Sequence, residues 1–317
     1  MKARSLMLVF FASVAVLQRW PLAQTPDEIT RLLQAYVRLD TSNPPGDTRK
    51  AADFLAGVFQ RDGIRVERYE SAPDKAIVYA RLKATMTPAA GKALVLLHHM
   101  DVVPADKSQW KTDPFTPTMT AAERGEGVAA QPDRGTGAPG VNNVLWGRGA
   151  FDMKGQAVAQ ILAFLRLKRE NVPLNRDVIL LAHPDEEVGG AMGARWMIAN
   201  HYAELDPEYV IDEGGFGTRD LFAPGKLVYG ISVAEKKIVW LKVRAEGVAG
   251  HGSQPHDQNP NDRLVRAVAR LLSEPDRPVS APAGGRENLV EVMKGNVGTF
   301  ASNKFTNAIQ RSTIAVT

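Results

Sequence analysis

The chain has 317 residues, of which 44% are hydrophobic and 23% are charged, and its formal net charge is +4 at pH 7. This length fits one large domain or two unequal ones. The positive charge is scattered and forms no basic stripe with interleaved aromatic residues, which argues against nucleic acid as a partner. The chain contains no cysteine, so disulfides and thiol nucleophiles are excluded, and any metal must be held by His, Asp and Glu.

The N-terminal segment 1–23 has the pattern of a secretory signal peptide. Two basic residues precede an apolar run, Leu6–Leu17, which is too short to span a bilayer. Ala23 is a possible last residue before cleavage, but Pro21 is an unfavourable neighbour, so an uncleaved anchor is the alternative. We expect a secreted or periplasmic protein with no stable membrane span after cleavage.

Beyond this segment, the pattern alternates between helices and strands. Helical spacing of the apolar residues predicts three helices, at Pro26–Leu39, Arg49–Arg61 and Gly155–Leu167. Two short apolar runs, Ala93–Leu97 and Val178–Ala182, are typical of strands buried on both faces of a parallel sheet. A strand, a helix and a second strand in this order predict a right-handed crossover in an α/β sheet.

Other stretches are predicted to lie outside this sheet. Thr41–Gly46, with the sequence TSNPPG, is a turn-rich loop, and Ala121–Asn143, rich in Gly, Ala and Pro, is a surface excursion. Beyond Ser232 the character changes, because Lys237–Glu246 alternates as a strand and Asn261–Leu272 has the spacing of an amphipathic helix. We expect a second, smaller α+β unit there.

The first acidic motif, LVLLHHMDVVP, directly follows a predicted buried strand. Ligands bind at such strand ends in open α/β sheets. His99 and Asp101 are two residues apart and face the same way in extended chain, so the carboxylate can orient the imidazole. A His–Asp pair that only forms a turn is an equally good interpretation of this motif by itself.

Three further motifs contain acids in comparable places. WGRGAFDMKGQ puts Asp152 before a helix; an N-cap would explain the aspartate, but the glycines around it allow a closer backbone approach than a cap needs. In ILLAHPDEEVGG, a predicted strand is followed by three adjacent acids. Their charges repel one another unless a cation or solvent reduces the repulsion. A solvated charge run is the usual interpretation, but this cluster emerges from the core. YVIDEGG repeats the pattern.

In this order and spacing, the motifs HxDVVP, GRGxxDxKG, DEExGG and DEGG resemble the M20 family of metallopeptidases, which includes aminoacylases, carboxypeptidases and amino-acid deacylases. The resemblance covers the chain from about Thr25 to its end. It implies a zinc-exopeptidase-like catalytic domain at 24–231, with a mostly parallel sheet and flanking helices. It also implies an incomplete, ferredoxin-like α+β lid or dimerisation domain at 232–317.

The resemblance implies two zinc ions, with Co²⁺ or Mn²⁺ as substitutes, and it assigns Asp152 as the aspartate that bridges them. It assigns the further metal ligands to His99, Glu187 and Glu213, with Asp212 as the rival of Glu213. The family also tends to have a cis peptide bond after the bridging aspartate, here Asp152–Met153.

The same resemblance assigns roles in catalysis. Glu186 would be the general base, which takes a proton from a water bridged between the zinc ions and passes it to the leaving amine. Asp101 would orient His99 from behind. His251, in AEGVAGHGSQPH, matches a lid histidine that reaches across a homodimer to stabilise the oxyanion; a loop histidine that caps local backbone is the alternative. His98 and His183 are expected to be packing or rim residues.

The end of the chain departs from the family pattern. NKFTNAIQRSTIAVT resembles a lid segment that usually contains Asn-x-Ile-Pro, but Gln310 replaces the proline. In relatives, an arginine that grips the substrate carboxylate and a last metal-binding histidine follow later, and neither is present here. We therefore expect a fragment, a truncated gene product or a partial sequence, whose full-length relative would be active even where this chain alone is not.

Two hypotheses about function remain. The first is metal-dependent hydrolysis of a peptide or N-acyl amide bond in small substrates with a free carboxylate. The absence of GxSxG and HExxH motifs argues against a serine nucleophile and against the common helical zinc site. The second is an inactive homologue that serves only in binding or dimerisation; the missing C-terminal residues favour it, whereas Asp152, Glu186 and Glu187 argue against it.

Overall fold

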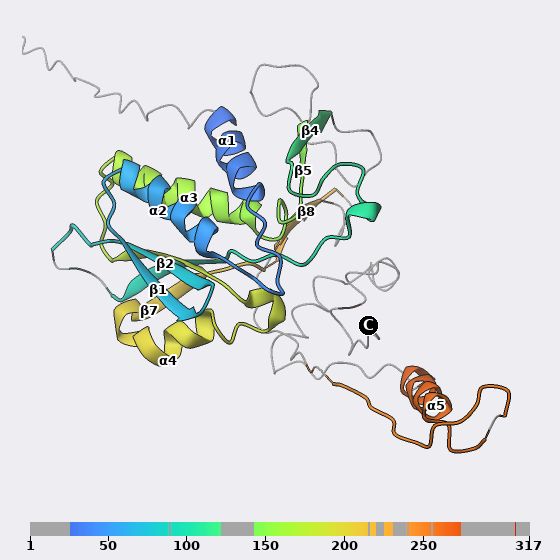
Figure 1. Ribbon diagram of the computed structural model, residues 1–317. Helices are drawn as coiled ribbons and strands as arrows, with labels where there is room; N and C mark the ends of the chain where they lie inside the picture. The colour runs from blue at the N-terminus through green and yellow to red at the C-terminus, as the bar shows by residue number, and fades with distance from the viewer. Residues whose placement is uncertain are drawn as a thin grey trace, which may run out of the picture. The chain divides into compact units, whose positions relative to one another are not determined.

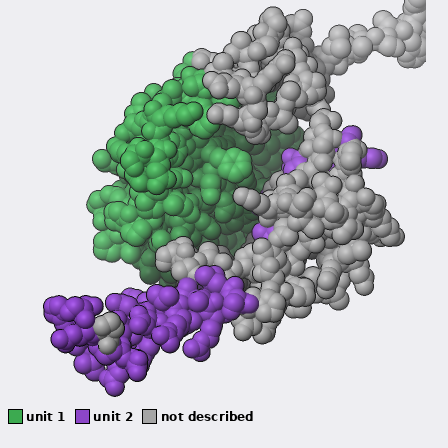
Figure 2. All heavy atoms as spheres, turned by 90° about the vertical axis from the view of Figure 1, so that its right-hand side faces the viewer, with its two compact units in different colours: residues 1–213 green, residues 214–317 purple. Residues whose placement is uncertain are grey.

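The computed structural model describes residues 26–87, 89, 91–121, 143–214, 216–219, 225–230, 239, 241–254, 256–273 and 308. The chain divides into two compact units, residues 1–213 and residues 214–317 (Figure 2). The predicted signal peptide, 1–23, lies outside the described residues, and the predicted domain boundary at 231/232 stays a prediction. Among the described residues, no helix has both the length and the apolar character needed to cross a lipid bilayer.

The first unit contains a five-stranded sheet with the order β1-β2-β6-β3-β7. Its strands are β1 (Val66–Ala72), β2 (Lys75–Leu82), β3 (Ala93–His99), β6 (Val178–His183) and β7 (Pro207–Ile211). β3 pairs in parallel with β6 and β7, whereas the β1–β2 hairpin joins β6 through an antiparallel pairing. The α/β class is confirmed, and the sheet is mixed. The hairpin was not predicted, because β1 reads VERYESA and its charged residues interrupt any apolar run.

Helices cover both faces of this sheet (Figure 1). On one face lie α1 (Pro26–Val37), α2 (Arg49–Arg61) and α3 (Lys154–Arg169), and on the other lies α4 (Ala194–Leu205). The bounds of α2 agree with the prediction, and α1 ends two residues before its predicted end at Leu39. Lys154 explains how that end is held, because its buried amine donates to the carbonyl oxygens of Tyr36 at 3.3 Å and Leu39 at 2.7 Å.

β6 supplies residues to two cores, one on each face of the sheet. Leu180 and Ala182 pack with helix residues such as Leu55 and Ile161 on the side of α2 and α3, while Ile179 and Leu181 pack with Met197 of α4. Because successive residues of a strand face opposite sides, a strand covered on both sides must be apolar throughout. The continuous apolar run therefore predicted this strand correctly.

Shorter elements lie beyond the sheet of the first unit. They are the 3₁₀ turns η1 (Lys107–Gln109) and η2 (Glu186–Val188) and the strands β4 (Thr118–Ala121) and β5 (Asn143–Trp146). β4 and β5 pair antiparallel. Residues 122–142, nearly all of the predicted surface excursion, lie outside the described residues.

The second unit is described only in parts. β8 (Phe216–Arg219) pairs antiparallel with β9 (Leu227–Gly230), and α5 (Pro260–Ser273) confirms the predicted amphipathic helix. The strand predicted over 237–246 is wrong at its described positions, 239 and 241–246, which have no regular secondary structure and are mostly exposed. A segment with alternating apolar residues becomes a strand only where a neighbouring strand pairs with its main chain. The ferredoxin-like fold of this domain stays a prediction.

Candidate metal centre

The site begins where three parallel strands end. In the register of β3 and β6, His99 lies opposite His183, so both strands reach their carboxyl ends at the same level. β7 runs parallel to β3 on its other side. The acids that follow β6 and β7 therefore arrive at the same edge of the sheet as His99, which is where open α/β sheets bind ligands.

His99 is buried and has its two ring nitrogens in different surroundings. Nδ1 lies 2.9 Å from the main-chain oxygen of Asp101, and because a carbonyl oxygen only accepts, Nδ1 carries the proton and donates it. Nε2 faces the acids, at 3.1 Å from Asp152 Oδ1, 3.5 Å from Glu213 Oε2 and 3.9 Å from Glu186 Oε2. With Nδ1 engaged in this way, Nε2 is the ring nitrogen that would bind a metal ion once it gives up its own proton.

The carboxylates gather into two overlapping groups around this nitrogen. One group is His99, Asp152 and Glu187, and the other is His99, Glu186 and Glu213; within each group, the potential ligand atoms lie within 4.8 Å of one another. All four residues predicted as metal ligands, and the predicted base, are thus brought together. Asp212 belongs to neither group; its Oδ1 accepts the main-chain N–H of Glu213 at 2.8 Å.

The charges in the cluster fit divalent cations. Burial alone lowers the pKa of His99, but hydrogen bonds to Asp101, Asp152 and Glu213 outweigh it and raise that pKa to about 12. Burial, together with the nearby Glu213 and Glu187 carboxylates, raises the pKa of Glu186 to about 7. A cation would take the place of the proton on the imidazole and relieve repulsion among the acids. Zinc, cobalt and manganese all accept imidazole and carboxylate donors.

Asp101 has a wider role than orienting one histidine. Its main-chain oxygen makes the short contact with His99 Nδ1, and its carboxylate Oδ1 lies farther away, at 3.6 Å. The buried carboxylate accepts the main-chain N–H of Glu186 at 3.2 Å and that of Glu187 at 3.3 Å. Asn43 Nδ2 donates to it at 2.8 Å. Asp101 therefore positions the main chain of Glu186 and Glu187 as well as the imidazole of His99.

The loop before α3 shows why its motif is rich in glycine. Gly149 has φ +79°, and a Cβ there would lie 2.6 Å from Val102 Cγ1. A Cβ on Gly155 would overlap the carbonyl oxygen of Ala150. Close approach to this backbone thus accounts for the two glycines. The alternative interpretation of Asp152 as an N-cap is wrong, because the N-cap of α3 is Met153 and no side chain caps it. The Asp152–Met153 peptide bond is cis, as the family resemblance implied.

Two further histidines of the first unit, His98 and His183, lie outside the cluster. His98 is buried, with Nδ1 3.3 Å from Gln160 Oε1, and burial lowers its pKa to about 3. His183 is also buried, with Nδ1 3.0 Å from its neighbour's carbonyl oxygen, so both are packing residues. His251 belongs to the second unit, where its Nδ1 lies 2.7 Å from Ser253 Oγ and accepts the Ser253 N–H at 3.2 Å.

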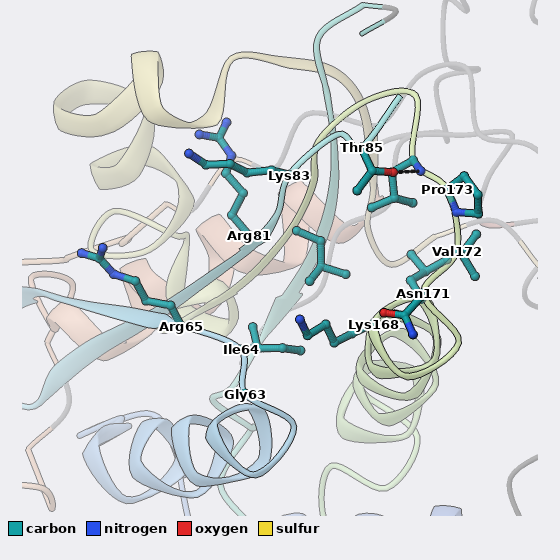
Figure 3. A pocket seen from close by; sticks show the side chains of 13 residues that line it. Gly63, Ile64, Arg65, Arg81, Lys83, Thr85, Lys168, Asn171, Val172 and Pro173 are labelled. Carbon is teal, nitrogen blue, oxygen red and sulfur yellow. Dashed lines mark hydrogen bonds between the residues drawn. The ribbon is translucent and has the colours of Figure 1, made fainter. Parts of the chain in front are cut away.

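A separate cavity of about 350 Å³ lies among the turn after α2, the end of β2 and the segment after α3 (Figure 3). Ile64, Thr85 and Lys168 are among the residues that line it, and none of its lining residues is acidic. It shares no residue with the carboxylate cluster, and it lacks the donors that a metal ion needs.

Some residues of the site were not predicted. Asn43 was seen only as part of a turn-rich loop, and Lys75 carried no signal at all. Lys75 Nζ lies 3.6 Å from Asp185 Oδ1 behind the acidic pair. The TSNPPG sequence offered little clue, since an asparagine in a turn commonly bonds its own backbone, whereas Asn43 bonds Asp101 and Asp185.

Comparison with known proteins identifies the family. Residues 95–297, more than half of the chain, match Peptidase family M20/M25/M40, and the chain belongs to this family. Aminoacylase-1 of Sus scrofa is 26% identical over 243 residues, which cover 76% of this chain and 53% of the aminoacylase. Succinyl-diaminopimelate desuccinylase of Methylobacterium radiotolerans is 29% identical over 258 residues, which cover 79% and 57%.

The chain thus spans about half the length of the curated relatives that it matches. Among solved structures, it is similar to the M20 family metallo-carboxypeptidase Sso-CP2 from Sulfolobus solfataricus, with 24% identity and a TM-score of 0.45 over 59% of this chain and 37% of that one. It is also similar to human carnosine dipeptidase 1, with 22% identity and a TM-score of 0.43 over 59% and 38%.

Proposed function

We propose that this chain is the metal-binding part of a hydrolase that cleaves a peptide or N-acyl amide bond in small substrates with a free carboxylate. One observation carries the proposal: the Nε2 atom of His99 and the carboxylates of four acids from distant parts of the chain converge at one edge of the sheet. The names of the two relatives, an aminoacylase and a desuccinylase, support an acylated amine as the substrate class.

In this proposal, the chain holds two zinc ions through the two groups of ligands. His99, Asp152 and Glu187 would hold one ion, and Glu213 would help to hold the other, with Asp152 between them. Divalent cations bound there would polarise the scissile carbonyl and acidify a water molecule. Co²⁺ and Mn²⁺ accept the same donors and would substitute.

Glu186 is the proposed general base. Its carboxylate lies beside the ligands, at 3.9 Å from His99 Nε2, yet its side chain is 44% exposed and therefore reaches water and substrate. It would remove a proton from the attacking water and deliver it to the leaving nitrogen. The Asp101 carboxylate would hold the Glu186 main chain still during both transfers, through the N–H bond described above.

The test is Glu186→Gln, assayed on N-acetyl amino acids and dipeptides together with zinc content. We expect the variant to keep its zinc and to lose at least about 100-fold in turnover, the usual contribution of a general base. A chelator should abolish turnover of the parent chain. Glu70→Gln, an exposed acid of β1, is the matched control and should change neither property.

Full turnover in a zinc-replete Glu186→Gln chain would refute the assignment of the base. A parent chain that binds two zinc ions but hydrolyses none of these substrates would favour the alternative, an inactive homologue that serves in binding or dimerisation. The two hypotheses therefore give different results in the same pair of measurements.

We also propose that the protein is exported and that residues 232–317 form a lid through which two chains associate. The basic and apolar pattern of 1–23 supports export, and the match of His251 to the family's lid histidine supports association. Fusion of 1–23 to a reporter enzyme tests the first, since the reporter should appear outside the cytoplasm. Light scattering during gel filtration tests the second, and a monomer at all concentrations would contradict it.

A further inference from the structure

A buried ion pair includes Asp185, the first residue of the acidic segment Asp185–Glu187 that contributes to the candidate metal centre. Lys75 Nζ is 3.6 Å from Asp185 Oδ1, and the two side chains are 12% and 9% exposed. A carboxylate so far from water needs a partner, because desolvation penalises its charge. Asp185 immediately precedes Glu186 and Glu187 and has left-handed backbone, with φ +78°. Whatever holds its side chain therefore helps to set the direction of the two residues that follow.

Asn43 joins this ion pair to Asp101. Its Nδ2 donates to Asp101 Oδ2 at 2.8 Å and lies 3.4 Å from Asp185 Oδ1, while its Oδ1 accepts from Lys75 Nζ at 3.5 Å. The Asp101 carboxylate in turn accepts the main-chain N–H groups of the two glutamates. A continuous series of polar contacts thus leads from the lysine to the residues of the metal centre.

Lys75 also fixes the loop that carries Asn43. Its amine donates to the carbonyl oxygens of Pro45 at 2.7 Å and Gly46 at 3.2 Å. Gly46 has φ +70°, and a Cβ there would overlap Lys75 Nζ and lie 2.6 Å from Asn43 Cγ. Glycine at this position is therefore what allows the lysine to approach. One ammonium group thereby connects the 41–46 loop, β2 and the segment after β6.

We propose that Lys75 is a positioning residue: through Asp185 and Asn43, its ammonium group holds Glu186 and Glu187 in the orientation in which their carboxylates face His99. The inference rests on the proposed function, because the centre being positioned is the proposed metal centre. Lys75 acts through other residues, since its contacts are Asp185, Asn43 and two carbonyl oxygens.

The first test measures zinc affinity of the full chain by competition with a chromophoric chelator. Lys75→Met should weaken zinc binding up to about 10-fold, the lower end of the effect seen when a direct partner of a ligand is removed, because Lys75 acts through an intermediate residue. Lys75→Arg keeps the charge and should stay closer to the parent than to Lys75→Met. Lys83→Met, which changes an exposed lysine directly after β2, is the control and should leave the affinity unchanged. Unchanged affinity in a folded Lys75→Met chain would overturn the inference.

A double variant separates positioning from general destabilisation. If the harm in Lys75→Met comes from a buried carboxylate that has lost its cation and keeps only the hydrogen bonds from Asn43 and the Met192 N–H, then Lys75→Met with Asp185→Asn should regain part of the lost zinc affinity, because no uncompensated charge remains. If the losses of zinc affinity in the two single variants simply add up in the double variant, the inference is contradicted. Gly46→Ala should act in the same direction as Lys75→Met, because the new methyl group displaces the amine.

The second readout needs no metal. Hydrogen exchange of the Glu186 and Glu187 amides, measured in the zinc-free chain, should be at least tenfold faster in Lys75→Met, while exchange within α3 stays as in the parent. Slow exchange that persists in the variant would overturn the inference. A parent chain that binds no zinc would instead refute the proposed function, so the two failures are distinguishable.

Discussion

β6 and β7 flank β3 on opposite sides, run parallel to it and are both followed by acids, yet only β6 is covered. Every residue of β6 is buried, whereas Tyr209, Val210 and Ile211 of β7 are 56%, 51% and 48% exposed. β6 lies between β3 and β2, while β7 is one of the two edge strands of this sheet among the described residues, with β1 at the other edge. Parallel pairing with β3 is thus enough to bring the acid that follows a strand to the candidate metal centre. The strand itself need not be buried.

The acids after these strands are also held differently. The main-chain N–H groups of Glu186 and Glu187 bind the buried Asp101 carboxylate, and Glu187 Oε1 accepts the Val103 N–H at 3.2 Å. The Glu213 N–H binds its own exposed neighbour, Asp212, at 2.8 Å. The two glutamates after β6 are therefore held by main-chain contacts without a metal, whereas Glu213, the proposed ligand after β7, is expected to gain order when a metal binds.

The largest expected effect concerns burial. Leu180→Ala in β6 should reduce the free energy of unfolding by about 2–5 kcal/mol, because it leaves a cavity in a packed core. Ile211→Ala in β7 should cost about 1 kcal/mol or less, because its side chain is already half exposed. Urea unfolding of both variants checks the difference, and equal losses would mean that β7 is covered in solution.

The second largest expected effect is the change in the free energy of unfolding when zinc is removed. A ligand that binds only the folded chain stabilises it by about 2.7 kcal/mol when its free concentration is 100 times Kd. Zinc should raise the free energy of unfolding by that amount, and amide exchange should slow more in β7 than in β6. The same zinc addition to Asp152→Ala is the control. An equal gain in that variant would place the zinc elsewhere.

A smaller effect is expected on zinc affinity when either of the two acids after β7 is replaced. Glu213→Gln should weaken zinc binding at least about tenfold, or 1.4 kcal/mol, because Glu213 Oε2 lies 3.5 Å from His99 Nε2. Asp212→Asn should change it less, since Asp212 lies in neither ligand group. Competition titration of both variants measures the difference, and the reverse order would make Asp212 the ligand.

The smallest expected effect concerns the exposed edge. Val210→Lys should change the free energy of unfolding by no more than about 0.5 kcal/mol, because surface substitutions rarely do more. It should nevertheless reduce any association through this edge, which is distinct from the proposed association through residues 232–317, because a lysine on an exposed apolar edge strand discourages pairing with another chain. Light scattering over a concentration series measures association, with Lys83→Met as the charge-removing control.

Much of the fold was predictable where local pattern and burial agree. The helix Arg49–Arg61 has its apolar residues on one face and packs that face on the sheet. The β1–β2 hairpin and the residues of 237–246 show the limits. The hairpin was missed because β1 carries charged residues on both of its faces, which hides the apolar pattern. The strand over 237–246 was predicted from an alternation of apolar residues, which becomes a strand only beside a partner strand.

The sequence by itself determined the kind of chemistry: one histidine and several acids in four ordered motifs, no cysteine, and membership of a metallopeptidase family. Only the tertiary structure decided which of these groups meet. It favours Glu213 over Asp212, turns the Asp101 carboxylate toward two main-chain amides, and brings in Lys75 and Asn43, which no motif singled out. The physical reason is register: the position of His99 opposite His183 in two paired strands, 84 residues apart, is set by the packing of the whole sheet and is not contained in any local pattern.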